Sequence, residues 1–364
     1  MFNKIDINNI EIVEIEATTY CNAGCPYCAR HDHGTSKTIE SLPLRHIPFE
    51  VFNQLREDLD FTSRNKSKDV ELWFVGNLGD VIMHPQLPQI WEYCVKNFGK
   101  IEVETNGGIR PIKFWQEAGR ISKEESQKAS DPATMTFAID GLKDTNHLYR
   151  KGVDWDRLIA NVEAYINAGG DATWKYLVFE HNKHQVDEAE RLAKKLGFTK
   201  FLPQYSTRYS DDIYDDEQIE LREKEGNFLS SDVDKVIEEE ARRLNIDLKN
   251  PTNDIECKSF VKNKIYINSH GRVWPCCWHS LEYDTTKLML QKTEPWMIPF
   301  IEKRFNDYTK YSLKEIASSR LWKQMTDAWE TEKRNNDGSL KMQLCYDKCS
   351  NSKWKLTCNI SKRD

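Results

Sequence analysis

The stretch CNAGCPYC, residues Cys21–Cys28, places three thiols within eight residues, after a strand-like run at residues 11–19. Three soft ligands this close together can hold an iron–sulfur cluster or a zinc ion. A zinc site would want a fourth ligand nearby, and His31 and His33 are the candidates. Four thiolates close a metal site, whereas three leave one coordination position open for chemistry.

The bulk composition bounds the class of protein. The chain has 364 residues, 39% hydrophobic and 30% charged, enough for one large α/β domain and a smaller one. A net charge of −6 lacks the excess of basic residues that is typical of nucleic-acid-binding proteins. No apolar run approaches the ~20 residues of a membrane span, and the N-terminus lacks the apolar core of a signal peptide. Ten cysteines then favour metal sites in a reducing compartment, so we expect a soluble cytoplasmic protein.

Strand-like and helix-like segments alternate up to about residue 205. The strand-like segments span residues 11–19, 70–75, 101–105, 134–139, 173–179 and 198–204, and the helix-like segments span 48–61, 85–98, 111–128, 155–168 and 185–196. This repeat predicts parallel strands joined by right-handed crossovers. Functional-looking residues follow strand after strand, which favours a barrel or an open partial barrel with its active site at the carboxyl ends of the strands.

The remainder of the chain changes character twice. Residues 211–250 begin with an acidic stretch and are interpreted as a helical connector. The segments Ile265–Ile267 and Arg272–Trp274, joined by a turn that contains Gly271, predict a small β-hairpin. Six cysteines lie around and beyond this hairpin: Cys257, Cys276, Cys277, Cys345, Cys349 and Cys358.

The first cysteine motif, Cys21-x3-Cys25-x2-Cys28 with the aromatic Tyr27 before its last thiol, resembles that of radical S-adenosylmethionine (radical SAM) enzymes. The resemblance implies that the three thiolates hold a 4Fe–4S cluster whose fourth iron binds SAM. One electron from the cluster would then cleave SAM to methionine and a 5′-deoxyadenosyl radical, which abstracts a hydrogen atom from a substrate. The electron would come from a one-electron reductant such as flavodoxin or ferredoxin.

Further segments at strand ends carry the resemblance along the chain. The segment Gly76–Asp80, followed by His84-Pro85, resembles the family's glycine-rich segment that meets the SAM ammonium, where most members have Glu in place of Asp80. Thr105–Gly107 and Phe137–Gly141 resemble the segments after the third and fourth strands. The resemblance implies SAM-binding residues Tyr27, Gly76, Gly79, Asp80, Thr105, Asn106, Asp140 and Arg150.

The residues alone leave simpler interpretations open. These segments also suit ordinary strand-to-helix turns, Asp140 a turn cap, and Arg150 a solvated helix position. Many members of the family have a serine that contacts SAM where this chain has Ala138, so another polar group must substitute there.

The later cysteines resemble the SPASM and twitch extensions of the same family, because thirteen residues separate Cys257 from Gly271 and four separate Gly271 from Cys276. The resemblance implies one closed auxiliary 4Fe–4S cluster, since adjacent Cys276 and Cys277 do not readily bind one metal together. Its expected ligands are Cys257, Cys276, Cys345 and Cys349, with Cys358 or Cys277 as alternatives. A structural zinc ion is the alternative occupant.

We therefore expect an α/β protein with a partial (β/α)6 TIM-like barrel and a small C-terminal twitch-like domain of β-hairpin plus helix. The expected divisions are residues 1–210 for the barrel, 211–250 for the acidic connector and 251–364 for the auxiliary-cluster domain. The expected reaction is a net oxidation of a small molecule by radical SAM chemistry, an oxidoreductase activity. Modification of a ribosomal peptide or protein side chain, a zinc-stabilised binding protein without enzymatic activity, and an electron-transfer protein with two clusters are the alternatives.

Overall fold

A computed structural model of the protein describes residues 6, 9–32, 35–62, 66–126, 133–205, 239, 241–243, 257–280, 302–320, 322, 345 and 349. Its strands are β1 (Ile12–Ile15), β2 (Glu71–Phe74), β3 (Ile101–Thr105), β4 (Thr134–Ala138), β5 (Asp171–Val178), β6 (Lys200–Tyr205), β7 (Lys264–Ile267) and β8 (Val273–Trp274). Its α-helices are α1 (Glu50–Thr62), α2 (Leu87–Asn97), α3 (Ile112–Ser126), α4 (Asn146–Tyr149), α5 (Trp155–Asn167), α6 (Val186–Leu196), α9 (Lys258–Val261) and α13 (Leu313–Ala317). Short 3₁₀ helices are η2 (Ser67–Asp69), η3 (Val81–Met83) and η4 (Lys183–Gln185).

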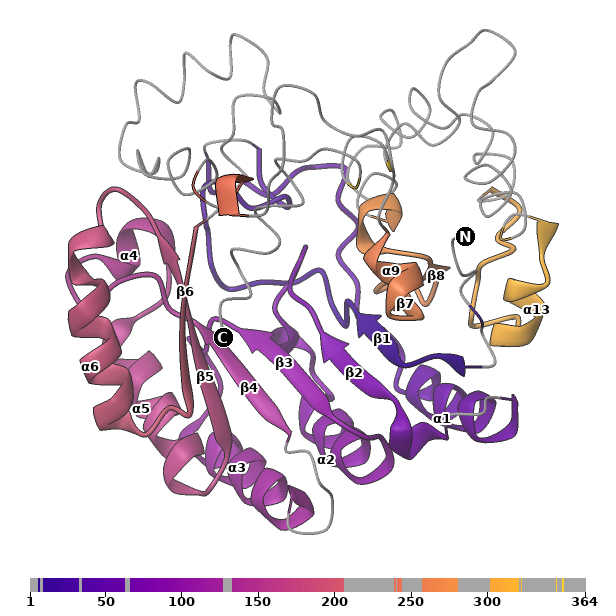
Figure 1. The fold of residues 1–364 in the computed structure, drawn as a ribbon, viewed down its shortest axis with the longest axis horizontal. Helices are drawn as coiled ribbons and strands as arrows, with labels where there is room; N and C mark the ends of the chain where they lie inside the picture. Colours follow the sequence, from indigo (N-terminus) through magenta and orange to yellow (C-terminus); the bar gives the residue numbers. More distant parts are fainter. Residues whose placement is uncertain are drawn as a thin grey trace, which may run out of the picture.

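All these strands belong to one open sheet in the order β6-β5-β4-β3-β2-β1-β7-β8. Strands β1 to β6 pair in parallel, each with its neighbour in the sequence. Helices α1, α2, α3, α5 and α6 lie along one side of the curved sheet (Figure 1). The predicted partial TIM-like barrel is therefore confirmed, with β6 and β8 at the two edges of the sheet.

The two faces of the sheet differ in polarity, because side chains alternate along each strand. Leu72 and Phe74 of β2 are buried, and the Phe74 ring lies 5.8 Å from the ring of Phe52 on α1. The opposite face of the same region presents Trp73 from β2 and Glu104 from β3, both only partly buried. The helix-covered face thus forms the core, and the face away from the helices is polar enough to receive ligands.

The predicted hairpin is present, but it is not an isolated element. Strand β8 pairs antiparallel with β7, and Gly271 in the turn has φ +69°, which favours glycine. Strand β7 pairs in parallel with β1, so that Val13 faces Ile265 in the ladder. The hairpin therefore extends the barrel sheet beyond its first strand (Figure 1).

Other expectations needed smaller changes. The first strand is shorter than expected and ends at Ile15, and the short helix α4 was not expected from the sequence. Most of the acidic connector, residues 211–250, lies outside the described residues. Within the described part of the chain, no helix has the length and apolar character needed to cross a membrane.

Candidate active site

The three-thiol loop follows β1 at the carboxyl edge of the sheet. Cys25 is buried, and Cys21 and Cys28 are half-buried. Gly24 ties the loop down, since its N–H donates to Lys151 O at 2.8 Å and its carbonyl oxygen accepts from Ser36 Oγ at 2.7 Å. Tyr27 is buried and packs in the core, which fits a role in holding the loop in place.

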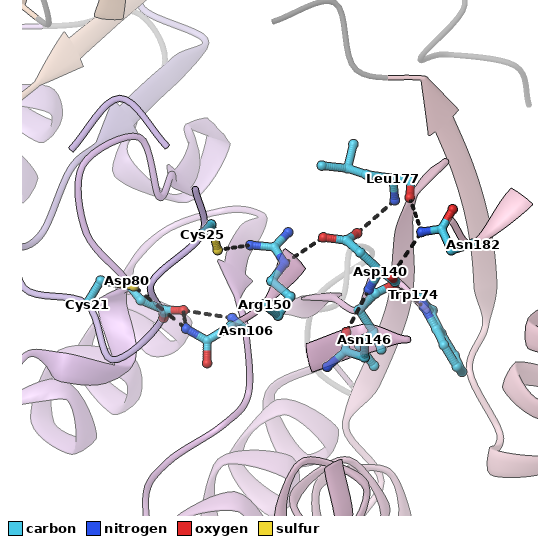
Figure 2. Close-up of polar contacts among 11 residues, drawn as sticks. Cys21, Cys25, Asp80, Asn106, Asp140, Asn146, Arg150, Trp174, Leu177 and Asn182 are labelled. Atoms are coloured by element: carbon cyan, nitrogen blue, oxygen red, sulfur yellow. Dashed lines mark hydrogen bonds and ion pairs between the residues drawn. The ribbon is translucent and has the colours of Figure 1, made fainter. Parts of the chain in front are cut away.

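Each thiol contacts a segment that follows a different strand. Asn106 Nδ2 lies 3.9 Å from Cys21 Sγ, and Arg150 Nη1 lies 3.7 Å from Cys25 Sγ. Cys28 Sγ lies 3.8 Å from the carbonyl oxygen of Asn77. The fold therefore brings together the cysteine motif and the strand-end segments after β2, β3 and β4 (Figure 2).

The surroundings of Cys21 and Cys25 disfavour loss of their thiol protons. Burial and, to a smaller extent, the nearby Asp80 charge together raise the pKa of Cys21 to about 12. Burial also raises the pKa of Cys25, against the opposing effect of Arg150. A positively charged partner is needed to convert such thiols to thiolates, as bound metal does. Among the residues that the structure describes, no three Cys, His, Asp or Glu side chains converge closely enough to hold a metal ion.

Of the two histidines considered as zinc ligands, the structure describes only His31. His31 is buried, and its Nδ1 lies 2.8 Å from the carbonyl oxygen of Cys25, so it braces the loop backbone. His33 lies outside the described residues.

Asp80 directs both carboxylate oxygens to protein donors. Oδ1 accepts from Ile82 N at 3.1 Å and Thr105 Oγ1 at 2.9 Å, and Oδ2 accepts from Asn106 N at 2.7 Å and Asn106 Nδ2 at 2.6 Å. A carboxylate has about four acceptor sites, so this set nearly exhausts them. Burial raises the pKa of Asp80, while these hydrogen bonds lower it. Asp80 thereby fixes the Thr105–Asn106 segment beside the thiols (Figure 2).

Asn106 connects that segment to the cysteine loop. Its Nδ2 donates to Asn22 Oδ1 at 2.9 Å, and its Oδ1 accepts from Asn22 Nδ2 at 3.1 Å and from Gly108 N at 2.9 Å. This reciprocal amide pair with Asn22 was not expected from the sequence. Thr105 Oγ1 also accepts from Gly107 N at 3.1 Å, and Gly107 has φ +66°. The Thr-Asn-Gly segment therefore connects the end of β3 to the cysteine loop next to the first thiol.

The glycine-rich loop after β2 is held by a residue that the sequence did not single out, Glu16. Its carboxylate accepts from the backbone N–H groups of Asn77, Leu78 and Gly79 at 3.0–3.1 Å. Gly79 has no room for a side chain, because a Cβ there would lie 2.0 Å from the carbonyl oxygen of Thr18. At Gly76 a Cβ would lie 2.9 Å from the carbonyl oxygen of Gly79. The glycines therefore permit close backbone packing at this turn.

Asp140 and Arg150 form a buried ion pair beside the second thiol. Arg150 Nε donates to Asp140 Oδ2 at 2.6 Å, and Asp140, which is fully buried, also accepts from Leu177 N at 2.8 Å (Figure 2). Burial alone would lower the pKa of Arg150, but Asp140 and Cys25 raise it well above its usual value. Arg150 Nη2 has no hydrogen-bond partner among the described residues. Arg150 is thus a fixed cation at the loop, and the solvated position considered above is wrong.

A second arginine, Arg30, was also not expected at this site. It is 5% exposed, and its Nε and Nη1 have no hydrogen-bond partner among the described residues. Its charge lowers the pKa of Cys21 against the effect of burial. A buried and incompletely paired guanidinium is costly unless an anion joins it.

The later cysteines gather near the hairpin. Burial raises the pKa of Cys349, and the neighbouring thiols of Cys345, Cys257 and Cys276 raise it further. His279 Nδ1 lies 3.4 Å from Cys276 Sγ, a candidate ligand position that the sequence did not suggest.

Cys277 lies in different surroundings from its neighbour Cys276. Burial raises its pKa, and the next contributions come from Glu14, Cys276 and Lys264 on the sheet. Cys276 has the His279 ring as a hydrogen-bond partner, whereas the charge that acts most strongly on Cys277 is that of Glu14. Cys358 lies outside the described residues.

Comparison with known proteins agrees with this arrangement. The family model described as the radical SAM superfamily matches residues 15–196, half of the chain. No curated protein matches the sequence.

Two solved structures have a similar fold. SuiB from Streptococcus suis, bound to precursor peptide SuiA, is 13% identical with a TM-score of 0.54, over 92% of this chain and 70% of SuiB. Polyhistidine-tagged anSMEcpe with bound AdoMet (SAM) is 14% identical with a TM-score of 0.50, over 97% of this chain and 99% of anSMEcpe. With its three-thiol loop at the end of the first strand of an open parallel sheet and a family match over half of its length, this protein belongs to the radical SAM superfamily.

Proposed function

We propose that the chain is an enzyme that holds a 4Fe–4S cluster through Cys21, Cys25 and Cys28, binds SAM at the open iron and abstracts a hydrogen atom from its substrate. The observation that carries the proposal is the contact of each thiol with a different strand-end segment, at 3.7–3.9 Å. Three sulfur ligands with an adjoining bed of polar groups suit a cluster with one exchangeable position.

The donor chemistry of the loop fits an iron–sulfur cluster. Cys21 and Cys25 have raised pKa values, so they need a bound cation to become thiolates. Arg150 contacts one thiol, and Arg30 is buried nearby with two nitrogens that lack a partner among the described residues; both cations suit the negative charge of three thiolates. When bound, the cluster supplies the electron that cleaves SAM to methionine and the 5′-deoxyadenosyl radical that abstracts hydrogen.

The protein groups around the loop would position SAM by charge. Arg150 offers its Nη2, which has no partner among the described residues, to the SAM carboxylate, while Asp140 holds its Nε. The glycine-rich loop presents the carbonyl oxygen of Asn77 toward the thiols, which suits the SAM ammonium. We assign Gly76, Gly79, Thr105 and Asn106 to the same site. Asp80 belongs to it through the backbone it orients, and Tyr27 through its packing under the loop.

The substrate is proposed to meet SAM over the polar face of the sheet. This face carries a Lys175–Glu104 ion pair with a 2.9 Å separation, in which both side chains are partly exposed. Ala138 lies beside Lys175 in the ladder, so Lys175 is the polar group nearest in register to the missing serine. Net oxidation of a small polar molecule is the reaction we propose, with flavodoxin or ferredoxin as reductant.

Peptide modification is the second candidate function. The observation that favours it is the SuiB structure, which has a similar fold and was solved with a precursor peptide bound. The same radical chemistry would act on a small molecule or on a peptide, so the two candidate functions differ only in their substrate.

We also propose an auxiliary 4Fe–4S cluster held by Cys257, Cys276, Cys345 and Cys349. The mutual effect of these thiols on the pKa of Cys349 supports their proximity. In this assignment Cys277, whose pKa is raised by burial and by the charge of Glu14, is not a ligand.

The proposal is tested by product analysis. Protein reconstituted anaerobically with iron and sulfide is incubated with SAM and dithionite, and 5′-deoxyadenosine is quantified by chromatography. We expect the product from the wild type and none from Cys25→Ala, with Cys94→Ala as the matched control because Cys94 is a buried thiol on α2. Equal product from Cys25→Ala, or none from the iron-loaded wild type, would contradict the proposal.

A further inference from the structure

Glu16 occupies an unusual position for a charged residue. It follows β1 directly, is 1% exposed, and lies 3.0 Å from Asn77 N, 3.1 Å from Leu78 N and 3.0 Å from Gly79 N. Three consecutive backbone N–H groups therefore share one carboxylate. Buried carboxylates are rarely left without such compensation, because the ionised form is costly to desolvate.

This arrangement fixes the direction in which the glycine-rich loop faces. Its N–H groups at residues 77–79 are all engaged by Glu16, so they are not available to a ligand. The carbonyl oxygen of Asn77 instead lies 3.8 Å from Cys28 Sγ, on the side of the cysteine loop. A carbonyl oxygen accepts a hydrogen bond from a cation such as an ammonium group and repels an anion.

The far side of Glu16 is held by the C-terminal part of the chain. Tyr266 on β7 is fully buried, and its hydroxyl donates to Glu16 Oε2 at 3.2 Å. Strand β7 itself pairs with β1. One carboxylate thus joins the first strand, the glycine-rich loop and the hairpin that carries Cys276.

We propose that Glu16 is a positioning residue for the SAM ammonium: it turns the carbonyl oxygen of Asn77 toward the cysteine loop. Tyr266 makes this position depend on the C-terminal hairpin. The inference rests on the proposed function, because SAM is the ligand it positions. It adds a residue outside the expected SAM contacts and a link between the two cysteine groups.

The test is SAM binding to the reconstituted protein by equilibrium dialysis, which gives both the dissociation constant and the number of sites. In Glu16→Gln one carboxylate oxygen becomes an N–H donor, so at least one of the three backbone N–H groups loses its acceptor. We expect a dissociation constant about tenfold higher, at unchanged iron content. The matched control is Glu14→Gln, which changes a buried glutamate on the same strand that pairs with Lys264 and does not touch the loop.

Tyr266→Phe provides a second test if Glu16→Gln folds poorly. It removes one hydroxyl and should weaken SAM binding about threefold. Its control is Tyr308→Phe, because Tyr308 is a buried tyrosine of the same C-terminal part whose hydroxyl bonds Asp58 instead.

The binding measurements distinguish failure of the Glu16 inference from failure of the proposed function. A merely structural role would reduce the number of SAM sites and leave the dissociation constant of the folded protein unchanged. Dissociation constants for Glu16→Gln and Tyr266→Phe that equal those of their controls would overturn this inference while the proposed function stands. Iron-loaded wild type that binds no SAM would overturn the proposed function itself.

Discussion

Two arginines next to the three-thiol loop place positive charge near its sulfur atoms, and they differ in their partners. Arg150 has a buried partner in Asp140, and the pair stands beside Cys25 (Figure 2). In Arg30, by contrast, Nε and Nη1 have no partner within the described part of the chain. Removing one member of a buried ion pair destabilises the protein, because the other charge is left without a partner. A buried charge that starts without a partner destabilises the protein until an ion of opposite charge binds beside it.

Asp140→Asn should destabilise the protein strongly, because it leaves the Arg150 charge buried without its carboxylate. We expect a loss of about 3 kcal/mol in the free energy of unfolding, measured with urea. Asp156→Asn is the control, since Asp156 pairs with Lys143 at 2.7 Å but both side chains are exposed. Its loss should stay under about 1 kcal/mol. Equal losses in the two variants would show that the buried pair has no special role.

Arg30→Met should have opposite effects on the protein with and without iron. Removing the unpaired charge should raise the free energy of unfolding of the metal-free protein by about 1–3 kcal/mol. The same change should lower the iron incorporated on reconstitution, because a cation near Cys21 is lost. Arg110→Met is the control, because Arg110 Nε is paired with Ile82 O at 2.6 Å and its loss should destabilise the metal-free protein. A metal-free Arg30→Met protein less stable than the wild type would contradict this account.

At the scale of the element, the segments after the strands were predictable because their residue types are unusual there. Three thiols, paired glycines and a Thr-Asn-Gly turn each stand out from the surrounding pattern. Glu16 and Asn22 did not, since a glutamate at the end of a strand and an asparagine in a loop are ordinary in a sequence. Only the fold reveals that Glu16 is buried against the loop at residues 77–79, which lies more than sixty positions later.

The two adjacent cysteines at the end of the hairpin should differ in function. Cys276→Ala should lower the iron content of reconstituted protein from about eight atoms to about four, because it removes a ligand of the auxiliary cluster. Cys277→Ala is the matched control and should keep about eight, since Cys277 is not a ligand in the proposed assignment. Iron and sulfide analysis measures both. The reverse result would exchange the two assignments, and about four atoms in the wild type would refute the auxiliary cluster.

At the scale of the whole molecule, the sheet unites the two ends of the chain. The repeat of strand and helix predicted β1 to β6 and their parallel order, and the turn at residues 268–271 predicted the β7–β8 hairpin. The pairing of β7 with β1 was not predictable, because strands about 250 positions apart carry no local signal for their pairing. The expected division of the chain at residues 210 and 250 stays a prediction.

His270 in the hairpin turn should make the attachment of this region sensitive to acid. Burial and, to a smaller extent, the charges of Arg45, Arg272 and Arg304 together lower its pKa from 6.5 to about 4. In the unfolded chain the histidine binds a proton more readily, so its contribution to stability is complete above pH 6.5 and is lost as pH falls toward 4.

The wild type should therefore lose about 1–2 kcal/mol more than His270→Asn between pH 7 and pH 5. Urea unfolding of the metal-free proteins measures this difference. His147→Asn, which changes an exposed histidine on α4, is the control and should follow the wild type. A His270→Asn protein with the same pH dependence as the wild type would contradict the assignment.

The three-thiol loop is proposed to hold a cluster whose open iron binds SAM. The most direct measurement is the electron paramagnetic resonance spectrum of the dithionite-reduced protein, with and without SAM, in a Cys276→Ala background that lacks the auxiliary cluster. We predict the signal of one reduced 4Fe–4S cluster whose g values shift when SAM is added. A spectrum that SAM leaves unchanged, or a colourless protein that holds zinc, would contradict this central proposal.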